Sequence, residues 1–269
     1  MNEAASVTVV IPWGTVNSPW PAVASALAQG RCVKEIFLLR NGTALTGEVR
    51  LKVPYFDDKL RIVDLPRCAN ANIARNVGLL LGSASFVAYL DADDSYPLGY
   101  LEAAIFGLEA EQADVSISSL KVTDRNGVRF LRASLDGFEG IENYLFCHNA
   151  GSSSGLVVRT ETRRACLWSW SLRRHQDYDY IARLFKDFPT IFRDDIFIST
   201  NRAGRRLGIK HIEDAFGLCI GWEQKVKGAY WRAHVWYLVR HLPFSFSWPA
   251  MFMLMKLIGV YLVNFFSRR

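Results

Sequence analysis

The chain has 269 residues, half of them hydrophobic, which is long enough for one large α/β core with an appended segment. Its five cysteines are scattered without a CxxC spacing, which argues against a disulfide framework or a zinc site and for reduced thiols in the cytosol. The net charge of +6 lies at the end of the chain, because seven Lys and Arg and no acid follow Glu223. This distribution argues against nucleic-acid binding, which needs a basic stripe on the folded domain.

The first 90 residues alternate between strand and helix patterns. The chain enters its first strand almost directly, without the basic and apolar regions of a signal peptide. Ser18 and Pro19 are typical of a helix start, and Gly30 of a helix end. Strands are predicted at 7–11, 34–39, 60–65 and 86–90, and a second helix at 70–81. This alternation predicts a mostly parallel, doubly wound α/β sheet.

The pattern is less regular from residue 97 to residue 221. Helices are predicted at 97–112, near 139–147 and at 176–186, and strands at 114–122, 156–159 and within 191–199. The residues Asp124-Arg125-Asn126-Gly127 are typical of a hairpin turn. Because no linker interrupts this part, we expect one domain over 1–221, with a nucleotide-binding part at about 1–120 and an acceptor-binding part at about 121–221.

Residues 222–269 form a basic, aromatic and apolar tail. The apolar run at 250–266 has 17 residues and contains Lys256 and Asn264, which makes it short and costly as a transmembrane span. Two amphipathic helices lying on anionic lipids are therefore favoured over one span. The alternative is a helix packed on the domain or in a dimer interface. The tail predicts a peripheral protein at the cytoplasmic face of the inner membrane.

Three acids follow the predicted strand 86–90. Asp91, Asp93 and Asp94 come where the strand ends, and ligands bind at the carboxyl ends of strands in open α/β sheets. Carboxylate oxygens suit Mg²⁺ or Mn²⁺, ions that usually bind together with a diphosphate. Helix capping by Asp94 and Ser95 is the simpler alternative, but it accounts for only one of the three acids.

Four separated motifs, within about residues 6–206, match the motifs of one protein family in order and spacing. They are Val9-Val10-Ile11-Pro12, Ala74-Arg75-Asn76-Val77-Gly78, Leu90-Asp91-Ala92-Asp93-Asp94, and Gln176-Asp177-Tyr178-Asp179 followed by Arg183-Leu184. With these motifs in this order, the chain resembles the family-2-type inverting glycosyltransferases. The resemblance implies the Rossmann-like GT-A fold.

The resemblance also implies roles for individual residues. Asp177 stands where the family carries the base that takes the proton of the acceptor hydroxyl, although capping of the nearby helix is an alternative role. Asp93 would be the main metal ligand, and Asp91 would reach the ribose or a metal-bound water, with Ala92 between them. Arg75 would lie beneath the nucleotide base, with Asn72 or Asn76 bracing the loop, and Pro12 would shape the nucleotide pocket.

Two positions depart from the family pattern. Asn41 occupies the place of an aspartate that usually pairs with uracil, and an amide both donates and accepts hydrogen bonds. Gln176 replaces the glutamate that usually precedes the base. A UDP-sugar remains the favoured donor.

Several other residues have both a functional and a plain interpretation. The Gly- and Arg-rich run 201–211 is interpreted as a flap over the donor diphosphate or a grip on a lipid diphosphate, with Arg202 in the nucleotide-sugar site. His211 is a candidate third metal ligand, although a lone histidine is more often an ordinary one. Arg173-Arg174-His175 would bind an anionic acceptor or be solvated, and Trp168 and Trp170 would stack on sugar or fill the core.

The sequence therefore predicts a metal-dependent inverting glycosyltransferase. It would move a sugar from a nucleotide donor to an acceptor hydroxyl, in our expectation on a lipid-linked saccharide of a surface polysaccharide. The alternatives are a catalytically degenerate scaffold on the same fold, which the change at Asn41 suggests, and a nucleotidyltransferase. The latter is less favoured because residues 12–17 lack a glycine-rich, lysine-containing loop.

Overall fold

The computed structural model covers most of the chain up to residue 201. The residues that it describes are 5–14, 18–42, 57–66, 68, 70–124, 126–148, 151–172, 174–201, 215, 217–219, 221–222, 226, 231, 252, 255 and 259. Arg202, His211 and most of the tail lie outside the described residues. Predictions about them are neither supported nor opposed by the structure.

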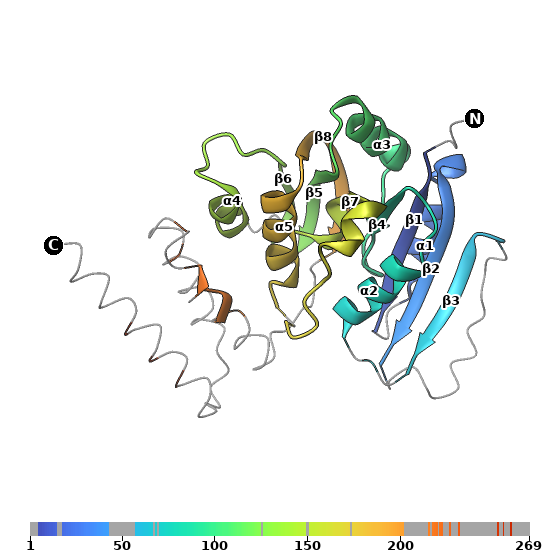
Figure 1. The fold of residues 1–269 in the computed structure, drawn as a ribbon, viewed down its shortest axis with the longest axis horizontal. Coiled ribbons are helices and arrows are strands. Elements are labelled where there is room, and N and C mark those ends of the chain that lie inside the picture. Colours follow the sequence, from blue (N-terminus) through green and yellow to red (C-terminus); the bar gives the residue numbers. More distant parts are fainter. Residues whose placement is uncertain are drawn as a thin grey trace.

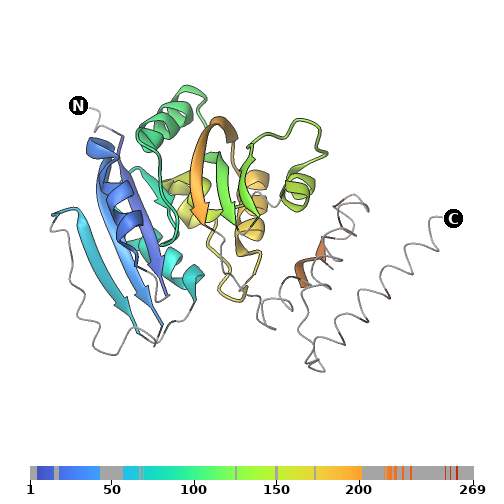
Figure 2. The ribbon, with the colours of Figure 1, turned by 180° about the vertical axis from the view of Figure 1, so that it is seen from behind.

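One eight-stranded sheet runs through the described domain (Figures 1 and 2). Its strands are β1 (Val7–Trp13), β2 (Val33–Asn41), β3 (Leu60–Leu65), β4 (Phe86–Tyr89), β5 (Val115–Asp124), β6 (Gly127–Leu131), β7 (Leu156–Arg159) and β8 (Thr190–Asn201). Their order is β3-β2-β1-β4-β7-β5-β6, and β8 pairs with β5. All the strands predicted from the sequence are present.

The sheet is parallel in one half and mixed in the other. Strands β1 to β4 pair in parallel, as the sequence predicts. The expectation of a mostly parallel sheet fails beyond β4, because β7 pairs antiparallel to both β4 and β5. The predicted turn between Asp124 and Gly127 is confirmed as the tight turn of the antiparallel β5–β6 hairpin. Such a turn reverses the chain without the crossover helix that a parallel pair needs.

Within the described domain five α-helices pack with the sheet: α1 (Trp20–Leu27), α2 (Ala71–Leu81), α3 (Tyr100–Ala110), α4 (Ile141–His148) and α5 (Gln176–Asp187). Helix α2 begins after Asn70, whose side chain accepts a hydrogen bond from the backbone N–H of Asn72. Helix α3 begins three residues later than predicted. The reason is Gly99, whose φ of +74° is left-handed and lies outside the helical range.

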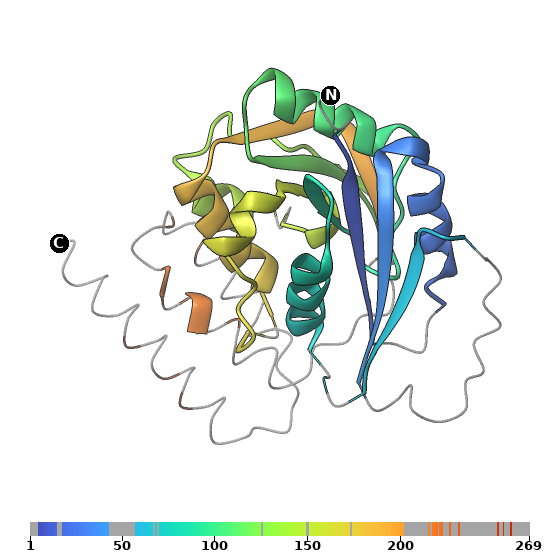
Figure 3. The same ribbon diagram turned by 45° about the vertical axis from the view of Figure 1, so that its right-hand side comes forward.

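The central strand β1 is buried on both faces. Val10 packs in a core with residues of α2, α4 and α5, whereas Val9 and Ile11 pack in a second core with α1 and α3. Figure 3 shows α1 and α2 on opposite sides of the sheet. This is the doubly wound arrangement that the sequence predicts, because alternate residues of a strand point to opposite faces.

A few residues beyond β8 are described, and some of them pack on the domain. Trp222, Val226 and Trp231 are buried in the same core as α4 and α5, and the Trp222 ring lies 5.4 Å from that of Phe146. The predicted tail therefore begins with residues that contact the domain. Among the described residues, no helix has both the length and the apolar character needed to cross a bilayer.

Candidate active site

The three acids form a tight turn directly after β4. The backbone N–H of Asp94 donates to the carbonyl of Asp91 over 3.0 Å, and one carboxylate oxygen from each acid lies within 4.8 Å of the others. Their exposure differs: Asp93 is exposed, the Asp91 side chain is 23% exposed and Asp94 is 4% exposed. Such a set of oxygens can bind a hard divalent cation, with Asp93 as its most accessible member.

A serine turn, residues 152–155, supports the acidic turn from the start of β7, the strand that pairs with β4. Ser153 donates to Oδ1 of Asp91 over 2.9 Å, and Ser154 donates to Oδ2 of Asp94 over 2.6 Å. The Ser154 hydroxyl also accepts the backbone N–H of Asp91 over 3.0 Å. Sequence reasoning identified only a loop here, although three consecutive serines between two glycines were the available signal.

Arg75 projects from α2 into the same network. Its guanidinium donates from Nη2 to Oδ1 of Asp91 over 2.6 Å and to the Ser153 hydroxyl over 3.0 Å, and from Nη1 to Oδ1 of Asn72 over 3.0 Å. Only 3% of the Arg75 side chain is exposed. The structure therefore joins two residues of the predicted nucleotide site, and the contact of Arg75 with a base stays a prediction.

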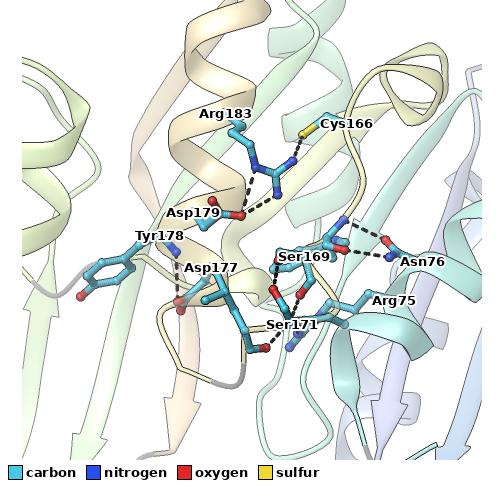
Figure 4. A network of polar contacts seen from close by, with 12 residues as sticks. Arg75, Asn76, Cys166, Ser169, Ser171, Asp177, Tyr178, Asp179 and Arg183 are labelled. Atoms are coloured by element: carbon cyan, nitrogen blue, oxygen red, sulfur yellow. Dashed lines mark hydrogen bonds and ion pairs between the residues drawn. The ribbon is translucent and has the colours of Figure 1, made fainter. Parts of the chain in front are cut away.

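The asparagines of α2 hold the segment that leads to α5. Asn76 exchanges two hydrogen bonds of 2.9 Å with the backbone of Trp168. Asn72 donates to the carbonyls of Ser169 and Leu172 over 2.7 and 2.8 Å. Figure 4 shows Arg75 and Asn76 facing the segment that contains Ser169 and Ser171, with α5 beyond it.

The two tryptophans of this segment differ in environment. Trp168 is 1% exposed and stacks on Tyr180 of α5 with ring centroids 4.0 Å apart, so it fills the core. Trp170 is 72% exposed. Of the pair predicted as a sugar platform, only Trp170 presents a ring surface on which a sugar can stack.

Asp177 lies in the first turn of α5. His175 occupies the N-cap position, but its side chain makes no capping hydrogen bond. Oδ1 of Asp177 accepts the backbone N–H of Tyr178 over 3.1 Å, which supports in part the alternative role of Asp177 at the start of this helix. Two residues further along α5, Asp179 accepts two hydrogen bonds from Arg183, of 3.0 and 2.7 Å (Figure 4).

Of the three basic residues before α5, Arg173 lies outside the described residues, Arg174 is half-buried and His175 is buried. His175 is 4% exposed, adopts a left-handed backbone with φ of 54°, and lies 4.6 Å from the Tyr178 ring. Nε of Arg174 is buried without a hydrogen-bond partner in the described part of the chain. His175 is therefore not solvated, because the rings of Phe146 and Tyr178 lie against it, and binding of an anionic acceptor by this segment stays a prediction.

The predicted nucleotide residues of β1 and β2 lie at the same carboxyl end of the sheet as the acids. Pro12 is buried and pairs with Leu39, and Asn41 is the last residue of β2 and is 5% exposed. Oδ1 of Asn41 is buried, and no described residue donates a hydrogen bond to it. Its amide lies against Gly14, where a Cβ would come within 2.8 Å of Nδ2. An unpaired buried acceptor at this edge is consistent with a contact to a ligand.

Residues 20–166 match the family model described as glycosyl transferase family 2. The match covers more than half of the chain and includes the acidic turn, the serine turn and Arg75. The chain belongs to glycosyl transferase family 2. This protein is therefore a glycosyltransferase. Its acidic turn contains Asp91, Asp93 and Asp94, the acids of the motif on which the resemblance rests. No curated protein sequence matches the chain significantly.

Solved structures of S. aureus TarS share the fold of this glycosyltransferase. TarS 1–349 has a TM-score of 0.60 at 16% identity, over 89% of this chain and 72% of that chain. Its complex with UDP-GlcNAc gives a TM-score of 0.59 at 16% identity, over 90% and 73%. The complex with UDP gives 0.58 at 15% identity, over 90% and 72%. The mixed α/β fold around a central sheet is thus that of GT-A glycosyltransferases.

Proposed function

We propose that this glycosyltransferase is metal-dependent and inverting, and that it transfers a sugar from a nucleotide-sugar, with UDP as the favoured nucleotide. The observation that carries the proposal is the acidic turn after β4, whose carboxylate oxygens lie within 4.8 Å of one another at the carboxyl end of the sheet. The family match over residues 20–166 includes this turn, and the resemblance implies that the acidic motif of the family lies there.

The chemistry of the acids fits a divalent cation. Three carboxylates this close repel one another, and a bound Mg²⁺ or Mn²⁺ relieves that repulsion. Asp93 and Asp91 would hold the ion, and the ion would offset the charge of the departing diphosphate. Asp94 is less suited, because Ser154 and the backbone N–H of Asn201 already donate to its two oxygens. The predicted third ligand, His211, stays a candidate outside the described residues.

The proposed base is Asp177. Its carboxylate would take the proton from the acceptor hydroxyl while that oxygen forms a bond to C1 of the sugar. The bond between C1 and the phosphate oxygen breaks on the opposite side, and the nucleoside diphosphate leaves with the electron pair. A single displacement of this kind inverts the configuration at C1. The position of Asp177 in the first turn of α5 supports this role, since it places the carboxylate at the end of a rigid helix.

Two observations support UDP as the nucleotide. The TarS structures of the same fold include complexes with UDP-GlcNAc and with UDP. In this chain, the buried acceptor Oδ1 of Asn41 has no described protein partner, and the N3–H of uracil is a donor of matching chemistry. Pro12, Ala92 and Arg202 complete the proposed nucleotide-sugar site.

The decisive experiment is calorimetric titration of the full chain with UDP, GDP and thymidine diphosphate, each with Mn²⁺ and with EDTA. We expect one nucleotide to bind, and only in the presence of metal. Asp93→Ala should abolish that binding, whereas Asp136→Ala, an exposed acid elsewhere, should not. If no nucleotide binds to the folded protein under any condition, the catalytically degenerate scaffold becomes the better explanation.

A second variant tests the base. Asp177→Asn should lower kcat by roughly 10²- to 10⁴-fold while sparing nucleotide binding. Asp187→Asn, an exposed acid in the last turn of the same helix, is the matched control. Full activity of Asp177→Asn would exclude Asp177 as the base.

We further propose that the segment 222–269 holds the enzyme at the cytoplasmic face of the inner membrane and that the acceptor is a lipid-linked saccharide. The tail carries seven positive charges without an acid after Glu223. Phe252 and Met255, both in helical conformation, are 61% and 65% exposed. Exposed apolar side chains and basic charge together favour an anionic lipid surface.

Vesicle sedimentation with the full chain tests this proposal. Replacing Lys256, Arg268 and Arg269 with Gln should weaken binding to phosphatidylglycerol vesicles by about 100-fold, since each charge near an anionic surface contributes about 1 kcal/mol. The same number of charges removed from the domain, at Lys121, Arg129 and Lys186, should have a smaller effect. Equal binding by both variants would refute the membrane role of the tail.

A further inference from the structure

Arg75 is buried between the two parts of the proposed site. Its guanidinium binds Asp91 of the acidic turn and Ser153 of the serine turn at 2.6 and 3.0 Å, and its side chain is 3% exposed. Ser153 also donates to the same oxygen of Asp91 over 2.9 Å. These three groups form a closed triangle, so the orientation of the Asp91 carboxylate depends on where Arg75 is held.

The ring of Trp168 contacts the guanidinium of Arg75 as well. The Cζ atom of Arg75 lies 4.6 Å from the centre of the Trp168 ring, a cation–π distance. Trp168 is 1% exposed, so water does not weaken this contact. A planar guanidinium can stack on an indole and still donate hydrogen bonds from its edge, whereas an ammonium group cannot do both in this way.

The Trp168 ring also contacts the two elements that carry the proposed chemistry. It stacks on Tyr180 at 4.0 Å with an interplanar angle of 20°, and Tyr180 lies three residues after Asp177 in α5. Its edge packs at 80° against Tyr89, 5.1 Å away, and Tyr89 is the last residue of β4, two residues before Asp91. One buried ring therefore connects the helix of the proposed base with the strand of the proposed metal ligands.

We propose that Arg75 and Trp168 act together as positioning residues, fixing the carboxylate of Asp91 relative to α5 and thereby to Asp177. This inference rests on the proposed function. It gives Arg75 a task that charge alone cannot perform, because the guanidinium must stack on Trp168 and bind Asp91 and Ser153 at the same time. Neither residue touches the reacting atoms in this role.

The competing explanation is that Arg75 only offsets the charge of three neighbouring acids. Arg75→Lys separates the two, because it keeps the positive charge and removes the planar fork. Trp168→Phe keeps an aromatic ring but reduces the surface that contacts the guanidinium of Arg75, and also the surface against Tyr180 and Tyr89. Ser153→Ala removes the third member of the triangle, and it keeps the test decisive if the core variant at Trp168 does not fold.

The experiment measures binding of Mn²⁺ with UDP by calorimetry, and kcat and KM by transfer assays, on the full chain. We expect Arg75→Lys to weaken Mn²⁺-dependent UDP binding by about tenfold and to lower kcat, since a misplaced carboxylate costs about one good charge-assisted hydrogen bond. Trp168→Phe and Ser153→Ala should each weaken binding by about threefold. In the double variant Arg75→Lys/Trp168→Phe, the fold loss of UDP affinity should be smaller than the product of the two single-variant losses, because both changes disrupt the same contact.

Arg159→Lys is the matched control. Arg159 also stacks on a ring, with Cζ 4.8 Å from Phe86, and also pairs with acids, Glu109 and Asp114. Arg159 on β7 pairs with Phe86, the first residue of β4. It therefore lies at the opposite end of β4 from Asp91. We expect its substitution to leave Mn²⁺-dependent UDP binding unchanged.

The outcomes separate this inference from the proposed function. If the wild type binds UDP with Mn²⁺ and Asp93→Ala does not, while Arg75→Lys binds like the wild type, Arg75 acts by charge and the inference is wrong. A double variant whose fold loss of UDP affinity equals the product of the losses in Arg75→Lys and Trp168→Phe would also overturn the inference. If the wild type itself shows no metal-dependent binding, the proposed function fails and the inference fails with it.

Discussion

The side-chain amide of Asn76 pairs with the backbone of Trp168 through two hydrogen bonds of 2.9 Å, across 92 residues of sequence. Asn76 lies on α2, and Trp168 begins the segment that leads to α5. This amide therefore fixes the backbone on which the buried indole of Trp168 is carried. Its two bonds use the donor and the acceptor of the same peptide-like group, so no residue without an amide can replace it.

Replacement of Asn76 by Ala should lower the free energy of unfolding by about 2 to 4 kcal/mol, because it leaves the N–H and the carbonyl of Trp168 without partners. Urea denaturation followed by circular dichroism measures the loss. Asn126→Ala, at the exposed turn after β5, is the control and should cost less than about 1 kcal/mol. A loss at Asn76 no larger than at Asn126 would show that water replaces both bonds.

Asp93 and Asp94 are neighbours that we expect to behave differently. Asp94 is 4% exposed and accepts hydrogen bonds from Ser154 and from the backbone N–H of Asn201 over 2.6 and 3.2 Å. Asp94→Ala should therefore destabilise the protein by about 2 to 4 kcal/mol. Asp93→Ala, at an exposed position, should change stability by no more than about 0.5 kcal/mol and affect only ligand binding. Thermal unfolding of the two variants without metal distinguishes these roles; equal melting temperatures would contradict the assignment.

Substitution of Asn41 should weaken nucleotide binding without lowering the stability of the ligand-free protein. Removing its unpaired buried acceptor with Asn41→Ala should not destabilise the ligand-free protein, since that atom forms no hydrogen bond with the described residues. The same change should weaken nucleotide binding by about tenfold if the base donates to that oxygen. Calorimetry and thermal unfolding on one preparation measure both quantities. A destabilised variant with wild-type nucleotide affinity would mean that Asn41 has a structural role instead.

Glu35 should make stability depend on pH. Burial acts to raise the pKa of Glu35, but hydrogen bonds from the backbone and hydroxyl of Ser83 and from Thr8 outweigh it, with a contribution from Arg61, and the pKa is lowered. Those bonds to its Oε1 measure 2.6, 2.9 and 2.9 Å. Because the folded-state pKa lies below the unfolded one, the stabilisation is complete above the unfolded pKa and is lost as the pH falls through the folded one.

Glu35→Gln tests this dependence. At about pH 7 the variant should be less stable than the wild type by about 1 to 2 kcal/mol, because neutral hydrogen bonds replace charge-assisted ones. The difference should shrink as the pH falls through the folded-state pKa of Glu35. Chemical denaturation of both proteins at a series of acidic pH values measures it. A difference that is constant with pH would mean that the carboxylate charge contributes nothing.

The elements of this fold were predictable because their signals are local. Nearly continuous apolar runs mark β1 and β2, Asn70 caps α2, and Asp124 to Gly127 forms the hairpin turn. The acidic turn was predictable for the same reason, since its acids are consecutive residues at a strand end. The direction of β7 was not, because a short buried strand has the same pattern whether its neighbours run parallel or antiparallel.

The amino-acid sequence alone thus predicted most of the strands and helices in chain order, the family and the acids of the candidate site. The fold then gave those acids different environments: Ser154 and Asn201 bury and bind Asp94, while Asp93 stays exposed. It also brought Arg75 and Ser153, 78 residues apart in sequence, together on Asp91, with the Trp168 ring against the Arg75 guanidinium. No local pattern encodes such contacts, because burial and hydrogen-bond partners arise only when distant segments pack together.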